Sequence, residues 1–157
     1  MQYSPYPALG RATRGVTLLE LMLVVALVLL IAALAVPAYT GYIDRARVSR
    51  AVADIGGISL QLARWQTSFG MLPNTLADAG GDRQIDPWGR PYVYLNIANA
   101  RPGQLRRDKN LVPVNTDFDL YSVGKDGQTV TAFTAQPARD DVVRANNGRY
   151  VGLAENY

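Results

Sequence analysis

The apolar positions of the chain form two different patterns within its first seventy residues. From Val16 to Val36 the segment is almost wholly apolar, with Glu20 as its one charge and Thr17 as its one hydroxyl. At about 1.5 Å per residue, a helix of this length spans a hydrocarbon core about 30 Å thick. The pattern therefore predicts a membrane-spanning helix over residues 16–37, and Pro37 is expected to kink the helix or to leave one hydrogen bond missing.

Beyond this segment the apolar positions become one-sided. They recur at spacings of four and three: Val48, Val52, Ile55, Ile58, Leu62, Trp65 and Phe69. This spacing is typical of one buried helix face. We therefore expect one long helix over residues 16–69, with residues 38–69 as its amphipathic half and with Trp65 and Phe69 in the core.

Residues 70–157 show shorter signals, typical of strands and turns. They predict a loop at 70–81, a turn at Asp86–Gly89, strands at 92–97 and 118–123, a weaker strand at 129–133 and a polar excursion at 98–116. In the first strand, Val93, Leu95 and Ile97 alternate and are expected on the buried face. The predicted fold class is α+β, with a small antiparallel sheet covering the apolar stripe of the helix.

Composition closes off several function classes. The chain has no cysteine and no histidine, so disulfides, Cys/His zinc sites and Ser-His-Asp or Cys-His catalysis are excluded. Its net charge of +3 includes Arg11 and Arg14, which precede the apolar run, and no nucleic-acid partner is expected from the nearly neutral remainder. A membrane-anchored enzyme using Asp140 and Asp141 as an acid–base pair is a further alternative, but adjacent carboxylates usually diverge, and we predict no enzyme.

Three interpretations of the N-terminal segment compete. It could be a cleaved signal peptide, with Ala33-Leu34-Ala35 as an A-x-A site, or a plain signal anchor. The third interpretation turns on Glu20, because a carboxylate near the bilayer centre costs about 2.5–3.5 kcal/mol and needs a positive partner. Cleavage after Gly15 would create such a partner, since the new α-amino group of Val16 lies four residues before Glu20.

The residues around this point carry a family resemblance. The run Arg14–Glu20, which reads Arg-Gly-Val-Thr-Leu-Leu-Glu, precedes the apolar segment and Val36-Pro37-Ala38-Tyr39. It resembles the cleavage and methylation signature of type IV prepilins and type II secretion pseudopilins. The family usually has phenylalanine where this chain has Val16.

The resemblance implies a processing and assembly route. A prepilin peptidase would remove residues 1–15 by cutting after Gly15, and would then N-methylate Val16. The hydrophobic helix would stay attached, and in a filament the Glu20 carboxylate would neutralise the Val16 ammonium of a neighbouring subunit. A low dielectric strengthens such a pair and makes its loss costly.

The C-terminal part narrows the resemblance. Residues 86–92 read Asp-Pro-Trp-Gly-Arg-Pro-Tyr, and residues 119–127 read Asp-Leu-Tyr-Ser-Val-Gly-Lys-Asp-Gly. Both segments resemble the G-type major pseudopilin of type II secretion systems, whereas ordinary major pilins more often close a loop with a disulfide. The alternative is a type IV pilin of a surface fibre for adhesion, motility or DNA uptake.

A G-type pseudopilin implies a location and a set of partners. The chain would be a single-pass protein of the inner membrane, with residues 70–157 as a periplasmic domain. It would form a homo-oligomeric filament that supports protein export across the outer membrane. Its partners would be minor pseudopilins, the prepilin peptidase, an inner-membrane platform protein and an assembly ATPase.

A metal site is the remaining candidate. Read alone, Asp117, Asp119, Asp126, Asp140 and Asp141 are turn and surface aspartates, and their spacing is not that of an EF-hand. The G-type resemblance implies a Ca²⁺ ion held by Asp126, Asp140, Asp141 and the carbonyl of Val123. The loop between Asp126 and Asp140 is longer here than in the family pattern. A bound ion would stabilise the domain in place of the absent disulfide.

Overall fold

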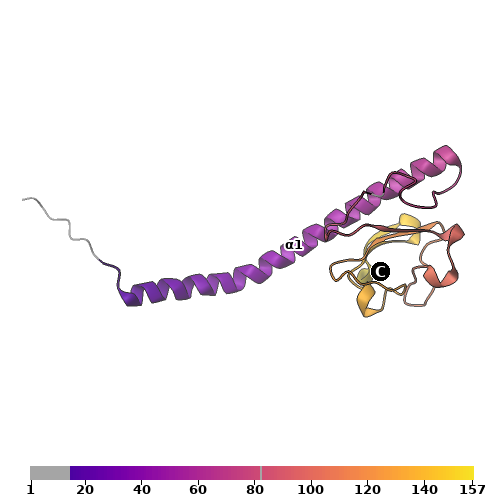
Figure 1. Cartoon of the computed structure of the whole chain (residues 1–157). Coiled ribbons are helices and arrows are strands. Elements are labelled where there is room, and N and C mark those ends of the chain that lie inside the picture. Colours follow the sequence, from indigo (N-terminus) through magenta and orange to yellow (C-terminus); the bar gives the residue numbers. More distant parts are fainter. Residues whose placement is uncertain (1–14, 82) are drawn as a thin grey trace, which may run out of the picture. The chain divides into compact units, whose positions relative to one another are not determined.

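The computed structural model of the protein describes residues 15–81 and 83–157, and it divides into two units after Gly41. Helix α1 (Leu18–Phe69) is continuous from the first unit into the second (Figure 1). This confirms the predicted long helix. It begins two residues later than expected because Thr17 caps it: the Thr17 hydroxyl accepts a 3.2 Å hydrogen bond from the N–H of Glu20.

Pro37 lies inside α1 and does not interrupt it. The helix therefore continues past this proline, which cannot donate a helical hydrogen bond. The Thr40 hydroxyl, one turn further on, donates a 2.9 Å hydrogen bond to the Pro37 carbonyl oxygen. This side-chain bond lies within the turn that follows the proline.

The C-terminal part forms a four-stranded antiparallel sheet in the order β1-β2-β3-β4. Its strands are β1 (Val93–Asn96), β2 (Phe118–Ser122), β3 (Val142–Ala145) and β4 (Tyr150–Leu153). One helix on one antiparallel sheet confirms the α+β prediction (Figure 1). The loop at 70–81 and the turn at Asp86–Gly89 are also present.

The strand predictions were only partly correct. The run at 129–133 is not a strand and makes only an isolated bridge between Ala132 and Arg107. Strands β3 and β4 were missed. All four residues of β3 are buried, including Arg144, so the strand lacks the alternation of a half-buried strand.

The main core lies between α1 and one face of the sheet. Three residues of the apolar stripe are fully buried, namely Ile55, Ile58 and Leu62, and Ala51, which was not predicted to belong to the stripe, is buried beside them. They pack with a set that comes from the loop and the sheet: Leu76, Tyr92, Phe118, Leu120 and Val142. Burial of each isoleucine or leucine side chain contributes about 1.5–3 kcal/mol to stability. The stripe therefore holds the part of α1 that belongs to the second unit against the sheet.

The stripe ends before the helix does. Phe69 is exposed and Trp65 is half-buried, with their ring centroids 4.2 Å apart. The expectation that Phe69 lies in the core was wrong. The buried cluster reaches only as far along α1 as Leu62, and the rings of Trp65 and Phe69 contact each other beyond its end.

The buried face of β1 also differs from the prediction. Tyr92 and Asn96 are buried, whereas Val93 and Leu95 are half-buried. The alternation was read correctly but assigned to the wrong face. The face toward the main core carries Tyr92 and Tyr94. Their hydroxyl groups donate hydrogen bonds to the carboxylate of Asp54 in α1 and to the carbonyl oxygen of Pro73 in the loop.

A second, smaller core lies on the opposite face of the sheet. It joins residues of β3 to the long loops: Val114, Phe133, Val143, Ala145 and Ala154. Tyr121 and Tyr150 pack against this cluster. The sheet is therefore covered on both faces, which explains why β3 is wholly buried.

Candidate functional site

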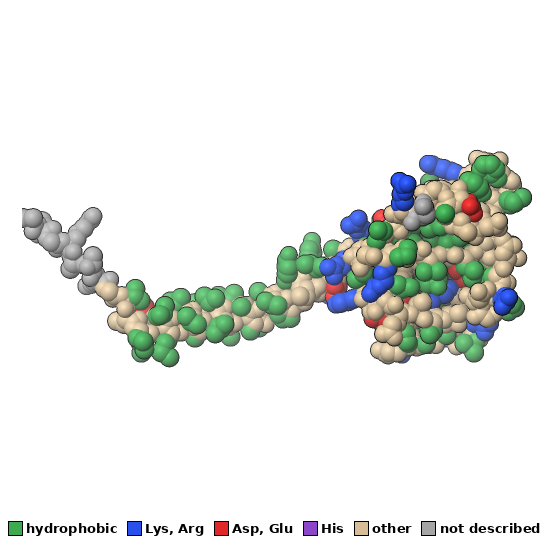
Figure 2. Space-filling model, in the orientation of Figure 1, with side chains coloured by type: hydrophobic (Ala, Val, Ile, Leu, Met, Phe, Trp, Pro, Cys, Tyr) green, Lys and Arg blue, Asp and Glu red, His purple; other side chains and the backbone are tan. Residues whose placement is uncertain are grey.

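The N-terminal segment presents apolar side chains along its whole described length. Gly15, Val16 and the residues that follow are exposed, and α1 is long and apolar enough to cross a membrane once (Figure 2). Residues 1–14 of the predicted leader lie outside the described residues. The cleavage after Gly15 and the methylation of Val16 therefore stay predictions.

Glu20 stands in the first turn of α1. Its backbone N–H is held by Thr17, and its carboxylate is exposed at the end where helix N–H groups are unpaired. A negative charge there stabilises a helix by about 0.3–1 kcal/mol. This local role is compatible with the predicted contact to a neighbour's ammonium group, because an exposed carboxylate is free to meet one.

The two C-terminal segments that carry the resemblance contact each other. The buried Asp86 carboxylate accepts hydrogen bonds from the N–H groups of Trp88 and Arg90, at 3.0 and 2.8 Å. Its other oxygen accepts a 2.5 Å hydrogen bond from the Ser122 hydroxyl. Arg90 in turn donates a 2.8 Å hydrogen bond to the carbonyl oxygen of Gly124. The turn at 86–90 is therefore fixed to the end of β2.

The turn after β2 closes over Asp140. One oxygen of the Asp140 carboxylate accepts the N–H groups of Lys125 and Asp126, at 2.7 and 2.9 Å. Gly124 has a φ of +65°, and a Cβ at this position would lie 2.4 Å from the Asp140 carbonyl oxygen. Only glycine fits this conformation and this close approach.

Asp141 has a different environment from its neighbour. It is fully buried, and its Oδ2 accepts 2.5 Å hydrogen bonds from Arg106 Nη2 and from the Thr129 hydroxyl. Burial raises the pKa of Asp141 to about 6, against the opposing effect of Thr129 and Arg106. The guanidinium of Arg106 is buried as well, so the two charges form an internal ion pair.

These positions do not fit the predicted calcium ion. Asp126 is exposed and its Oδ1 accepts the N–H of Gln128, while Asp140 is held by backbone donors and Asp141 already has a cation. Across residues 15–81 and 83–157, no three acidic side chains gather as a metal-binding group. Ca²⁺ takes six to eight oxygen ligands, and this arrangement offers no such set. Calcium binding stays a prediction without support from the geometry.

Two buried arginines were missed at the level of sequence. Arg106 lies in a basic run that resembles a solvated loop, and Arg144 interrupts a short apolar strand. Arg144 makes a bidentate pair with Asp117, at 2.9 and 2.6 Å. Although burial acts to raise the pKa of Asp117, the bonds from Arg144 and from the N–H of Phe118 hold it below its usual range. No local pattern marks either arginine, because their partners are distant in sequence.

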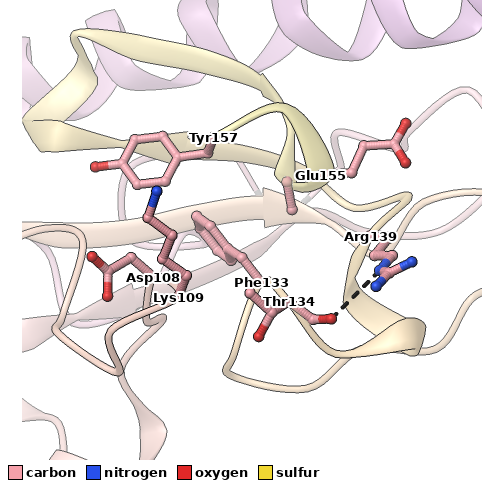
Figure 3. A pocket seen from close by; sticks show the side chains of 8 residues that line it. Asp108, Lys109, Phe133, Thr134, Arg139, Glu155 and Tyr157 are labelled. Atoms are coloured by element: carbon pink, nitrogen blue, oxygen red, sulfur yellow. Dashed lines mark hydrogen bonds between the residues drawn. The ribbon is translucent and has the colours of Figure 1, made fainter.

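A surface cavity of about 460 Å³ lies beside the C-terminal residues (Figure 3). Its lining includes the acids Asp108 and Glu155 and the cations Lys109 and Arg139. The ring of Tyr157 meets that of Phe133 edge-on, with centroids 5.6 Å apart. Mixed charge around an aromatic pair does not favour one class of ligand, and the cavity was not among the predicted sites.

Comparison with known proteins decides the family. The chain is 30% identical over 139 residues to the type II secretion system core protein G of Pseudomonas aeruginosa, covering 75% of this chain and 87% of the relative. The chain belongs to the family of type IV pilins and type II secretion pseudopilins. It is also 31% identical over 142 residues to the type IV major pilin protein PilE of Neisseria gonorrhoeae, with 85% and 83% covered. A protein G of Aeromonas hydrophila is 28% identical over 142 residues, covering 77% of this chain and 89% of the relative.

No family model and no solved structure matches the chain. The curated relatives nevertheless confirm the predicted resemblance, and with it a pilin-like structural subunit rather than an enzyme. They do not choose between the two filament systems. A secretion protein and a pilin match this pilin-like chain at nearly equal identity, 30% and 31%.

Proposed function

We propose that this pilin-like subunit is the major pseudopilin of a type II secretion system. The observation that carries the proposal is the contact between the two segments that resemble G-type pseudopilins. Asp86 in the first segment bonds Ser122 in the second, and Arg90 bonds Gly124. The absence of cysteine agrees with this choice, because the domain holds together without a disulfide-closed loop.

Assembly would proceed through the apolar half of α1. After cleavage behind Gly15, the charged amino group of Val16 and the Glu20 carboxylate would both be exposed on an otherwise apolar helix. Packing such helices together buries these charges, and only a pair between neighbours compensates the cost. The pair would therefore set the axial position of one subunit against the next.

The same proposal gives the chain its place in the cell. Residues 16–37 would cross the inner membrane once, with residues 70–157 in the periplasm. The filament would grow from its own copies with minor pseudopilins, served by the prepilin peptidase, the platform protein and the assembly ATPase. Its growth would support export of proteins across the outer membrane.

A gene deletion in the host tests the choice of system. If the proposal is right, the deletion strain accumulates secreted proteins in its periplasm, and the gene in trans restores their release. Surface fibres, counted by electron microscopy, stay unchanged. Normal secretion together with a loss of surface fibres would reject the proposal in favour of a type IV pilin.

That second candidate rests on a specific observation, the match to the gonococcal pilin over 85% of the chain. Both candidates require the same processing. Mass spectrometry of the N-terminal peptide checks it, because N-methyl-Val16 is expected in either case. A chain that starts at Val36, after the Ala33-Leu34-Ala35 site, would overturn both.

A further inference from the structure

Three loop segments meet beside the second core, at the side chain of Arg106. They are the excursion around Arg106, the loop around Thr129 and the approach to β3 at Asp141. None is a helix or strand, and the chain has no cysteine to cross-link them. In the family pattern, the loop that ends at Asp140 and Asp141 is the one expected to close on Ca²⁺.

Arg106 contacts all of these segments with one side chain. Its Nη1 donates 2.6 Å hydrogen bonds to the Thr129 hydroxyl and to the Val130 carbonyl oxygen, and its Nη2 donates to Asp141. Its backbone N–H donates a 2.8 Å hydrogen bond to the Asp119 carboxylate in β2. The guanidinium therefore contacts several oxygen atoms, as a bound metal cation would. Its N–H donors are held in a fixed planar arrangement, which sets the directions of these contacts.

Aromatic rings enclose the same guanidinium. Its central carbon lies 4.3 Å from the ring centroid of Tyr121 and 5.0 Å from that of Phe133. The side-chain exposures of the pair are 3% for Arg106 and 0% for Asp141. A cation held between two rings and a carboxylate is desolvated, and such contacts are strongest away from water.

We propose that the Arg106 guanidinium takes the structural place that the family resemblance gives to calcium. Asp141 needs a positive partner because it is buried, and Arg106 supplies that charge from within the chain. One oxygen of Asp141 has no hydrogen-bond partner among the described residues, but a single oxygen falls far short of a calcium shell. The inference does not depend on which filament system uses the subunit.

Calcium dependence is the first test. The full chain, purified in detergent micelles, is unfolded thermally in excess EGTA and in millimolar CaCl₂. The expected midpoints agree within about 2 °C, because the domain's cation is its own arginine. A midpoint that rises with CaCl₂ and falls with EGTA would overturn the proposal and restore the calcium prediction.

A double-mutant cycle is the second test. Arg106→Met leaves Asp141 buried without its cation, and Asp141→Leu leaves Arg106 without its anion, so each variant alone should lower the midpoint by roughly 10–20 °C. The double variant should recover a large part of that loss, because it buries neither charge. Losses that simply add would show that the pair has no anchoring role.

Arg139→Met serves as the matched control. Arg139 is exposed and precedes the same acidic pair, and among the described residues its side chain makes one hydrogen bond, to the Thr134 carbonyl oxygen. Its loss should move the midpoint by less than about 3 °C. If a single variant of the cycle fails to fold, the calcium experiment on the unaltered chain still decides the proposal.

Discussion

The Tyr92 hydroxyl donates a 2.9 Å hydrogen bond to the Asp54 carboxylate, and so joins the entry of β1 to the middle of α1. Burial raises the pKa of Tyr92 well above its usual range, and the bond to Asp54 adds to the effect. Tyr94, whose hydroxyl donates to the Pro73 carbonyl oxygen, has its pKa raised by burial to about 12. Both phenols therefore stay neutral in the folded domain at a pH where they would ionise in the unfolded chain.

Alkaline solution should destabilise the domain for this reason. A tyrosine whose folded pKa is raised contributes stability that is present below its unfolded pKa of about 10 and is lost as pH rises through the folded value. We expect the urea midpoint to fall steadily between about pH 10 and pH 12. In a titration of the folded chain followed by tyrosinate absorbance, Tyr92 and Tyr94 should ionise after the other tyrosines. The Tyr92→Phe variant should be less stable than the unaltered chain at pH 7, and its urea midpoint should fall by less between pH 7 and pH 12. An equal loss in both proteins would contradict the assignment.

Replacing Asp86 should loosen the turn that it organises. Asp86→Ala removes the acceptor of Trp88, Arg90 and Ser122 at once. Leaving such donors unpaired costs about 1–3 kcal/mol each when they stay buried, so we expect a loss of roughly 2–4 kcal/mol in the free energy of unfolding. Asp126→Ala in EGTA is the control, because Asp126 is exposed and accepts one local bond; its loss should stay below about 1 kcal/mol.

The long helix could be predicted from sequence because its signals are local. The apolar run, the stripe from Val48 to Leu62 and the cap at Thr17 all lie within a few residues of the positions that they determine. The buried ion pairs could not, since Arg106 and Asp141 are separated by 35 positions and Arg144 and Asp117 by 27. A charged residue in a short strand resembles a surface residue until the loops that cover it are known.

The same contrast between local and distant signals explains which parts of the candidate site could be predicted from the sequence. Gly15, Val16 and Glu20 form a compact motif that the sequence displays directly. The calcium ligands were transferred through a loop that is longer than the family pattern. Sequence could not reveal that an arginine from the polar excursion contacts Asp141, which is one of the predicted ligands.

Two glycine substitutions should have opposite effects. Gly124→Ala places a Cβ at φ +65° against the Asp140 carbonyl, so we expect a loss of more than about 2 kcal/mol. Gly57→Ala lies inside α1 with open space around its Cβ, and should add about 0.5–1 kcal/mol through helix propensity. Chemical denaturation of both variants measures the difference. A neutral Gly124→Ala would show that the turn can move away from Asp140.

Removing the charge of Glu20 should separate processing from assembly. We expect Glu20→Ala and Glu20→Gln to be inserted and trimmed normally, since Gly15 and Val16 are unchanged, but to give few filaments. Immunoblots of the trimmed chain and electron microscopy of sheared filaments make the two measurements. Thr17→Ala is the matched control, because it removes the helix cap, worth about 1 kcal/mol, and keeps the carboxylate. A normal filament yield from Glu20→Gln would reject the assembly contact.

The simple order of the sheet, with each strand beside the one that precedes it in the chain, has a consequence for how the domain is made. Each strand can pair with the strand that precedes it as soon as it is present, without waiting for a later strand to insert between earlier ones. The last strand, β4, closes the free edge of β3, and the Ala154 N–H then bonds the Asp141 carbonyl oxygen at 2.9 Å. A chain truncated before Tyr150 would keep its helix and yet expose an unpaired edge, which marks it for degradation or aggregation before it can enter a filament.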